Sequence, residues 1–256
     1  MANSITRRGL IGHAGAALGA GLFGAAGRAA AEPRQSLLLP EVGQTFSLSL
    51  NAFGARLMVD LPQPLPTLNF IGSRVVQVVE RDADSVGLRV LAFAVEAAHP
   101  LFGKITMRLP YTHTDPDSVL KLVGADRLVE TWYQSMWVSF EKCGDCPGPF
   151  VFHTRQPAQW TAELTEFPPP EQGMNPDGSP TGGSLYQTTR PIRLISPEQI
   201  GKPAESGAGQ QADPAGSRAE TNPSCGTCPL GAPLPGTDGD YAVFEHLDFN
   251  QGRLSG

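Results

Sequence analysis

Residues 131–141 read Thr-Trp-Tyr-Gln-Ser-Met-Trp-Val-Ser-Phe-Glu and carry the clearest structural signal in the chain. Successive residues of a β-strand point to opposite sides, so every second side chain of this run shares a face. One face is largely apolar and consists of Trp132, Gln134, Met136, Val138 and Phe140. The opposite face carries Tyr133, Trp137 and two serines. This alternation predicts a half-buried β-strand over the whole run.

Similar short runs, separated by turn residues, follow one another from Gln44 onward. The Val-rich run Arg74–Arg81 and the run Val86–Ala98 flank a four-residue turn and together predict a β-hairpin. Residues 117–130 have a mixed period that fits either a short helix or a strand. About eight strands are expected in roughly 130 residues. Residues 35–167 are therefore predicted to form a mainly β domain, an antiparallel β-sandwich or an open barrel.

The composition agrees with a β-rich fold and excludes several other classes of protein. The chain of 256 residues contains 29 Gly and 24 Pro, about a fifth of the total against a usual share of roughly 12%. Both residues penalise helix interiors, which argues against a helical bundle. The formal net charge of −6 argues against a dedicated nucleic-acid-binding protein.

The composition changes after Phe167. Residues 168–224 are dominated by Pro, Gly, Ser, Gln and Glu, and only Thr188–Ile195 has an extended pattern. Such a sequence buries little apolar surface, so we expect a Pro/Gly-rich extended segment that is disordered or a linker over residues 201–224. Residues 225–256 contain two of the four Cys and an apolar run, and we expect them to dock on the β-domain.

The N-terminus has the organisation of an export signal. A charged start with Arg7 and Arg8 precedes an apolar run rich in Gly and Ala, which ends in small residues at Ala31. The sequence Thr6-Arg7-Arg8-Gly9-Leu10-Ile11 resembles a twin-arginine (Tat) signal peptide, which is an address read by a receptor. The resemblance implies that the Tat translocase recognises the two arginines and that the protein folds before export. Cleavage is expected after Ala31, with an uncleaved N-terminal anchor as the alternative.

Export would place the mature protein in the periplasm or outside the cell. Removal of residues 1–31 leaves 16 basic and 25 acidic side chains, a net formal charge of −9. This charge disfavours partnership with nucleic acid or with anionic membrane surfaces. The apolar run of the signal is weakly hydrophobic and no stable membrane span is expected after cleavage.

The four cysteines form two pairs with the same pattern, Cys-Gly-x-Cys-Pro. Cys143 and Cys146 lie between two predicted strands, where a hairpin tip is expected, and Cys225 and Cys228 lie in the C-terminal segment. Two such pairs match the ligand set of a tetrahedral zinc site. A zinc site or a cross-paired disulfide would tie the C-terminal segment to the domain, and in every interpretation the two pairs are expected to lie close together in space.

Three interpretations of the pairs remain open at this stage. Folding before export favours a structural zinc site, whereas the oxidising destination favours one or two disulfides, including a cross-pairing such as Cys143 with Cys225. A redox-active dithiol is the third interpretation. It is disfavoured because a strand pattern, and not a helix, follows Cys146-Pro147.

The remaining chemistry-bearing residues predict no catalytic site. His113 lies beside two acids on a presumed loop, His153 lies on a strand, and His246 lies in the C-terminal segment. No nucleophile elbow, zinc-protease motif or P-loop is present in the sequence. We therefore expect an exported, non-enzymatic binding or envelope-associated module, with an unidentified ligand or protein partner and a four-cysteine structural staple. The alternative is a redox or metal-dependent enzyme of the envelope that uses the two cysteine pairs.

Overall fold

The computed structural model describes residues 39–110, 115–200 and 228–254. These residues form fifteen β-strands and one short 3-10 helix. The elements are β1 (Thr45–Met58), β2 (Thr67–Arg81), β3 (Ser85–His99), β4 (Gly103–Arg108), β5 (Ser118–Val123), β6 (Arg127–Gln134), β7 (Trp137–Cys143), β8 (Cys146–Thr154), β9 (Ala158–Leu164), β10 (Gln172–Met174), β11 (Pro180–Gly182), β12 (Ser184–Thr188), β13 (Ile192–Ile195), η1 (Pro197–Gln199), β14 (Ala242–His246) and β15 (Phe249–Arg253). No helix within the described residues is long and apolar enough to cross a membrane.

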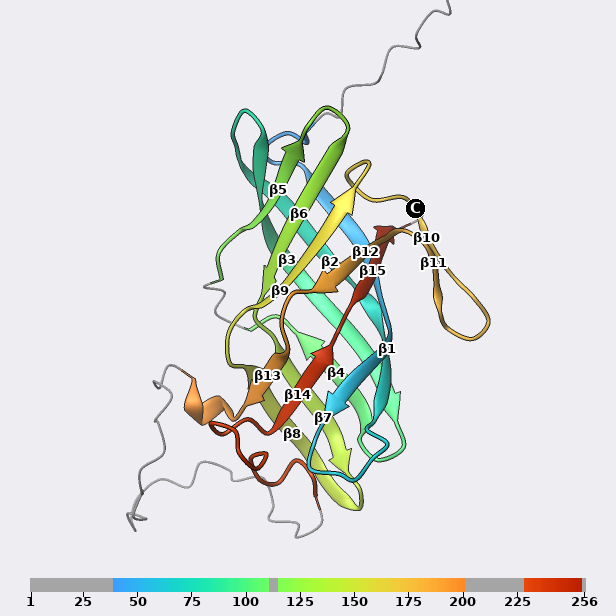
Figure 1. Ribbon diagram of the computed structural model, residues 1–256, viewed down its shortest axis with the longest axis vertical. Helices are drawn as coiled ribbons and strands as arrows, with labels where there is room; N and C mark the ends of the chain where they lie inside the picture. The colour runs from blue at the N-terminus through green and yellow to red at the C-terminus, as the bar shows by residue number, and fades with distance from the viewer. Residues whose placement is uncertain (1–38, 111–114, 201–227, 255–256) are drawn as a thin grey trace, which may run out of the picture. The chain divides into compact units, whose positions relative to one another are not determined.

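Thirteen strands form one antiparallel sheet that closes on itself twice, while β10 and β11 form a separate two-stranded sheet (Figure 1). The long strands β1, β2 and β3 lie side by side and belong to both closures. The pairing of β14 with β1 closes a lower ring of β1, β2, β3, β4, β7, β8, β13 and β14. The pairing of β3 with β5 closes an upper ring of β1, β2, β3, β5, β6, β9, β12 and β15. The predicted mainly β, antiparallel fold is confirmed.

The stretch 131–141 forms two strands, and not the single strand that its alternation predicts. β6 ends at Gln134 and pairs with β9 in the upper ring, whereas β7 begins at Trp137 and pairs with β4 in the lower ring. The chain therefore passes from one ring to the other between these strands. The predicted inward face is nevertheless correct: Trp132, Gln134, Met136, Val138 and Phe140 are all fully buried. The alternation persists because both strands bury the same face in one hydrophobic core, which continues from β6 to β7.

Two hairpins differ in how clearly the sequence predicts them. The predicted hairpin is present as β2 and β3, with Gln77 opposite Arg89 in its register. The ambiguous residues 117–130 form the hairpin of β5 and β6, which turns at Gly124 with a positive φ of 75°. Only one face of each short strand is buried over a few residues, so the sequence contains too few periods to separate strand from helix.

Strands C-terminal to residue 167 complete both rings. β12 pairs with β9 and β15, while β13 pairs with β8 and β14. β14 and β15 each pair with β1, so the sheet extends well beyond the predicted 35–167 domain. These short strands lie between two neighbours, and the pairing on both sides favours an extended conformation that composition alone does not predict. Residues 201–224, the expected linker, lie outside the described part of the chain.

The two rings enclose different side chains. The buried side chains of the lower ring include the aromatic residues Phe102, Phe140, Phe150, Phe152 and Phe244. The upper ring buries Trp132 stacked on Trp160, with their ring centroids 4.2 Å apart. The guanidinium carbon of Arg74, a fully buried cation, lies 4.2 Å from the centroid of the Trp132 ring. A cation in this position needs compensation, because an unpaired buried charge is strongly unfavourable.

Glu130 supplies that compensation. Arg74 donates a hydrogen bond from Nη2 to Oε1 of Glu130 over 2.6 Å, and from Nε to Oε1 of Gln251 over 2.5 Å. Tyr186 donates from its hydroxyl to the other oxygen of Glu130, over 2.6 Å. Burial, followed by the negative charge of Glu130, raises the pKa of Tyr186 well above its ordinary value. The tyrosine therefore keeps its proton and remains a hydrogen-bond donor to the carboxylate.

Candidate ligand pocket and its disulfide staple

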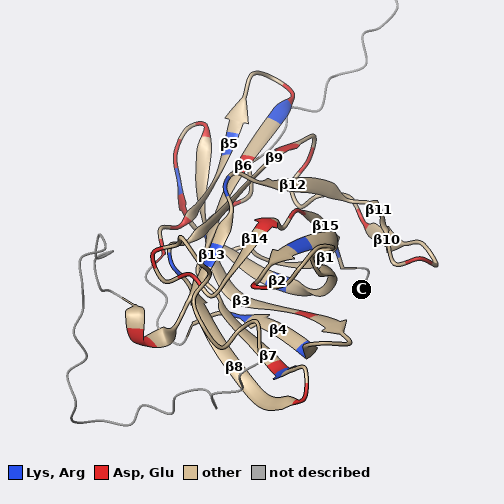
Figure 2. Cartoon of the chain, turned by 60° about the horizontal axis from the view of Figure 1, so that its bottom comes forward, with Lys and Arg blue, Asp and Glu red and all other residues tan. Residues whose placement is uncertain are grey.

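A pocket of about 330 Å³ lies between two connections that join the lower ring to the upper ring. The turn from β8 to β9 supplies one wall, and the chain that enters β13 supplies the other. The lining residues are Arg155, Gln156, Pro157, Ala158, Arg190, Pro191, Ile192 and Arg193. Three of these eight residues are arginines and none is acidic, so the lining is strongly cationic. Figure 2 marks the charged positions along the chain, among them the basic position on β13.

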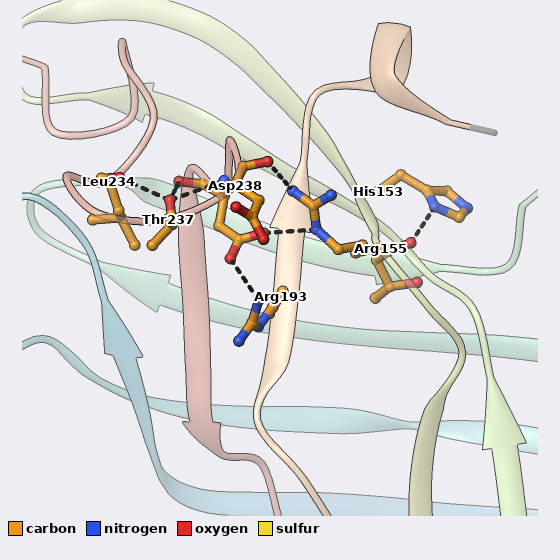
Figure 3. Close-up of polar contacts among 8 residues, drawn as sticks. His153, Arg155, Arg193, Leu234, Thr237 and Asp238 are labelled. Atoms are coloured by element: carbon orange, nitrogen blue, oxygen red, sulfur yellow. Dashed lines mark hydrogen bonds and ion pairs between the residues drawn. The ribbon is translucent and has the colours of Figure 1, made fainter. Parts of the chain in front are cut away.

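A carboxylate beside the pocket orients two of the arginines. Asp240 is 1% exposed; its Oδ1 accepts a hydrogen bond from Nε of Arg155 over 2.9 Å, and its Oδ2 lies 3.6 Å from Nη1 of Arg193 (Figure 3). Arg155 also donates from Nη2 to the backbone oxygen of Asp238 over 2.6 Å. The third arginine is held separately, because Nη2 of Arg190 donates to the backbone oxygen of Pro157 over 2.9 Å. The guanidinium groups are thus fixed in part before any ligand arrives.

The turn that carries Asp240 is itself closed by hydrogen bonds. The hydroxyl of Thr237 donates to the backbone oxygen of Leu234 over 2.7 Å and accepts from the backbone N–H of Asp240 over 3.2 Å (Figure 3). The backbone N–H of Leu234 donates in turn to the backbone oxygen of Asp240 over 2.6 Å. This turn therefore positions the carboxylate through its own backbone, independently of the arginines.

Replacement of Asp240 by Asn should lower the free energy of unfolding by about 2–3 kcal/mol, because Arg155 and Arg193 lose a buried anionic partner. Chemical denaturation measures the loss. Glu163→Gln is the matched control, since the exposed pair of Arg127 and Glu163 contributes under ~1 kcal/mol. Equal stability of the two variants would show that Asp240 does not organise the pocket.

The structure places the predicted cysteine staple directly beside this segment. Cys143 ends β7 and Cys146 begins β8, opposite each other at the hairpin tip, and both are buried. Cys143 forms a disulfide with Cys228, with Cα atoms 5.5 Å apart and a separation of 85 positions in the sequence. Cys146 is also disulfide-bonded. Cys225 lies outside the described residues, as do the signal residues Arg7, Arg8 and Ala31.

The disulfide and the pocket both involve β8 and the segment that follows Cys228. Cys228 begins the segment that continues to Asp238 and Asp240, and the disulfide attaches this segment to the hairpin of β7 and β8. The other end of β8 leads directly into Arg155. The bridge therefore anchors the start of this segment at the hairpin tip. Its other end, at Asp240, is held by strand β14, which begins at Ala242 and pairs with β13 and β1. Of the three interpretations of the cysteines, this geometry corresponds to cross-paired disulfides, whereas the zinc alternative stays a prediction.

None of the described histidines lines the pocket. His153 lies on β8, where its Nδ1 is 2.6 Å from the backbone oxygen of Thr154, and its ring packs edge-to-face on Trp137 (Figure 3). His246 ends β14, opposite Arg56 of β1. His113 lies outside the described residues. The contacts of His153 are those of a packed strand residue.

Sequence reasoning missed the arginines and the acid that form the pocket. Arg155 and Arg190 are 35 positions apart in the sequence, and each stands within two residues of a proline in a Thr-Arg-Gln-Pro or Thr-Arg-Pro turn. Those turns are recognisable as turns, but nothing in them predicts that they meet. Asp240 is part of an Asp-Gly-Asp turn whose pairing with Arg155 depends on the fold.

The comparisons with known proteins concern the fold alone. The chain matches no protein-family model and no curated protein sequence. It is similar in structure to DynF from the dynemicin biosynthesis pathway of Micromonospora chersina, with a TM-score of 0.54. The two sequences are 14% identical, and the match covers 84% of this chain and 83% of DynF. At this identity the likeness supports a shared β architecture and carries no activity from one protein to the other.

Proposed function

We propose that this protein is an exported, non-enzymatic binding module that takes a small ligand in the pocket between residues 155–158 and 190–193. The pocket itself carries the proposal, because its volume of about 330 Å³ lies within the range of small-molecule sites, roughly 300–1,000 Å³. The lining side chains are arginines, a glutamine and apolar residues. Such groups bind and orient a ligand, but arginine stays protonated and glutamine does not titrate, so none is suited to general acid–base catalysis.

Export through the Tat translocase is part of this proposal. The support is the resemblance of residues 1–31 to a Tat signal, together with a disulfide, which is typical of oxidising compartments such as the periplasm or the cell exterior. A chain recovered from the periplasm or medium should begin at Glu32, as intact-mass spectrometry can determine. Recovery of the full chain in the cytoplasm alone would refute this part.

Binding at the pocket can be tested without knowledge of the natural ligand. A mixture of small acidic, basic and neutral aromatic fragments is titrated into the ¹⁵N-labelled exported protein. We expect chemical-shift changes that centre on residues 155–158 and 190–193. Shift changes elsewhere, or no changes with any fragment, would contradict the proposed site.

A further inference from the structure

We propose that the ligand of this pocket is an organic oxyanion, a carboxylate or phosphate head group on a small apolar body. The inference rests on the proposed function and adds the chemical class of ligand. It is carried by the charge of the pocket, by the availability of its guanidinium groups and by its size.

The ion pairs among the described residues do not balance the charge of the pocket arginines. Arg155, Arg190 and Arg193 line the pocket, and Asp240 is the acid that pairs with two of them. Three positive side chains and this one negative side chain give a formal charge of +2. A cationic concavity attracts anions, and its low-dielectric walls strengthen the attraction. A cationic or neutral ligand would leave this charge without a partner.

The guanidinium groups differ in how far they are committed to the protein. Arg155 is 18% exposed and donates both to Asp240 and to the backbone of Asp238, so its main role is structural. Arg193 is 54% exposed, and its Nη1 lies 3.6 Å from Asp240, longer than a good hydrogen bond. Arg190 donates one of its five N–H groups to the backbone oxygen of Pro157. The planar fork of such groups matches the two oxygens of a carboxylate or phosphate.

The size and the remaining walls of the pocket require more than an inorganic ion. Pro157 and Pro191 stand on opposite walls beside the arginines and present apolar rings. Ala158 and Ile192 lie beneath them and are already buried. An apolar body attached to the head group would cover the two proline rings, and each buried apolar Å² contributes about 25 cal/mol. The walls thus favour an amphipathic organic anion over acetate or free phosphate.

Matched probes separate the head group from the body. Benzoate and phenyl phosphate carry the two oxyanion heads, benzamide is a neutral counterpart of benzoate, and acetate lacks the ring. We expect at least one of benzoate and phenyl phosphate to bind ~10-fold or more tightly than benzamide, because charge-assisted hydrogen bonds are lost in the amide. Acetate should bind more weakly than benzoate. The comparison of the two heads determines which oxyanion the site prefers.

Substitution of individual arginines shows which side chains bind the anion. Arg190→Gln and Arg193→Gln should each weaken binding of the preferred anion by ~10-fold while changing the affinity for benzamide little. Arg127→Gln is the control, because it removes an equal charge from an exposed pair on β6, outside the pocket. A thermal unfolding curve for each variant verifies that it is folded. Equal losses in all three variants would show general electrostatic attraction and would overturn the assignment.

The outcomes also separate this inference from the proposed function. If benzamide shifts the pocket resonances and binds as tightly as benzoate and phenyl phosphate, the binding site stands and the oxyanion class is wrong. If acetate binds as tightly as benzoate, the apolar body is wrong. If none of the four probes perturbs residues 155–158 or 190–193, the inference is refuted, and the broader fragment mixture then decides the proposed function.

Discussion

The variant Cys143→Ser/Cys146→Ser is expected to lose about 4.5 kcal/mol of unfolding free energy, the loop-closure value for a bridge that spans 85 residues. Both cysteines are replaced because Cys146 is disulfide-bonded too and would still cross-link the chain after Cys143 alone is changed. The physical reason is that a long closed loop restricts the unfolded chain much more than the folded one. Chemical denaturation measures the loss, and Asp145→Asn in the same turn is the control.

The same variant tests whether the bridge holds the segment that begins at Cys228. Without the bridge, this segment should be cut rapidly by a protease. Stability and protease resistance equal to those of the control would contradict the structural role of the bridge. Thiol counting and metal analysis of the wild-type protein complete the test. Four titratable thiols with one zinc per chain would replace the disulfide staple by the zinc site.

The second large effect is expected for Glu130→Gln, which should lower the free energy of unfolding by about 3–5 kcal/mol. Glu130 and Arg74 are both 0% exposed and their charged atoms are 2.6 Å apart. The neutral amide leaves the buried guanidinium without its counter-charge. It also places an N–H₂ group opposite either the Tyr186 hydroxyl or Arg74, both of which donate in the native network. Denaturant unfolding at neutral pH measures the loss.

Glu96→Gln provides the comparison for this prediction. Glu96 forms an ion pair with Lys104 at 2.7 Å, close to the length of the buried pair, but both side chains are about half exposed. Solvent screening limits such a pair to under ~1 kcal/mol. Similar losses in the two variants would show that burial inside the upper ring does not strengthen the pair of Arg74 and Glu130. A double variant, Arg74→Met/Glu130→Leu, should recover part of the loss, because it removes the unpaired cation.

Sequence reasoning predicted the fold class because alternation directly reports burial of one strand face. Trp132 to Phe140 shows this well: its inward residues are correct although the run is divided between β6 and β7. The division could not be predicted, because it depends on β9 and β4 as partners of the two halves. In the C-terminal part of the chain, β13 coincides with the predicted extended run Thr188–Ile195. Strands β12, β14 and β15 were not predicted, because they are short and form strands through pairing with β1 and β9.

In the candidate site too, local patterns could be predicted from the sequence, whereas contacts between distant residues could not. The Cys-Gly-x-Cys-Pro pairs are a local pattern, so the sequence indicated a staple between the hairpin and the C-terminal segment. It could not choose the partner of Cys143, because the choice depends on side-chain geometry in the folded chain. The arginines of the pocket have no local pattern at all. Their common position arises from two loops of the closed sheet and from the turn at Asp240, which is closed by its own hydrogen bonds.

The most direct test of this account is a crystal structure of the exported protein grown with benzoate and, in parallel, with phenyl phosphate. We expect the oxyanion head of one probe to lie within hydrogen-bond distance of Arg190 and Arg193, with its ring against Pro157 and Pro191. Asp240 should still contact Arg155, beside an intact bridge between Cys143 and Cys228. An empty pocket in both crystals, or density for the anion at another site, would contradict the account.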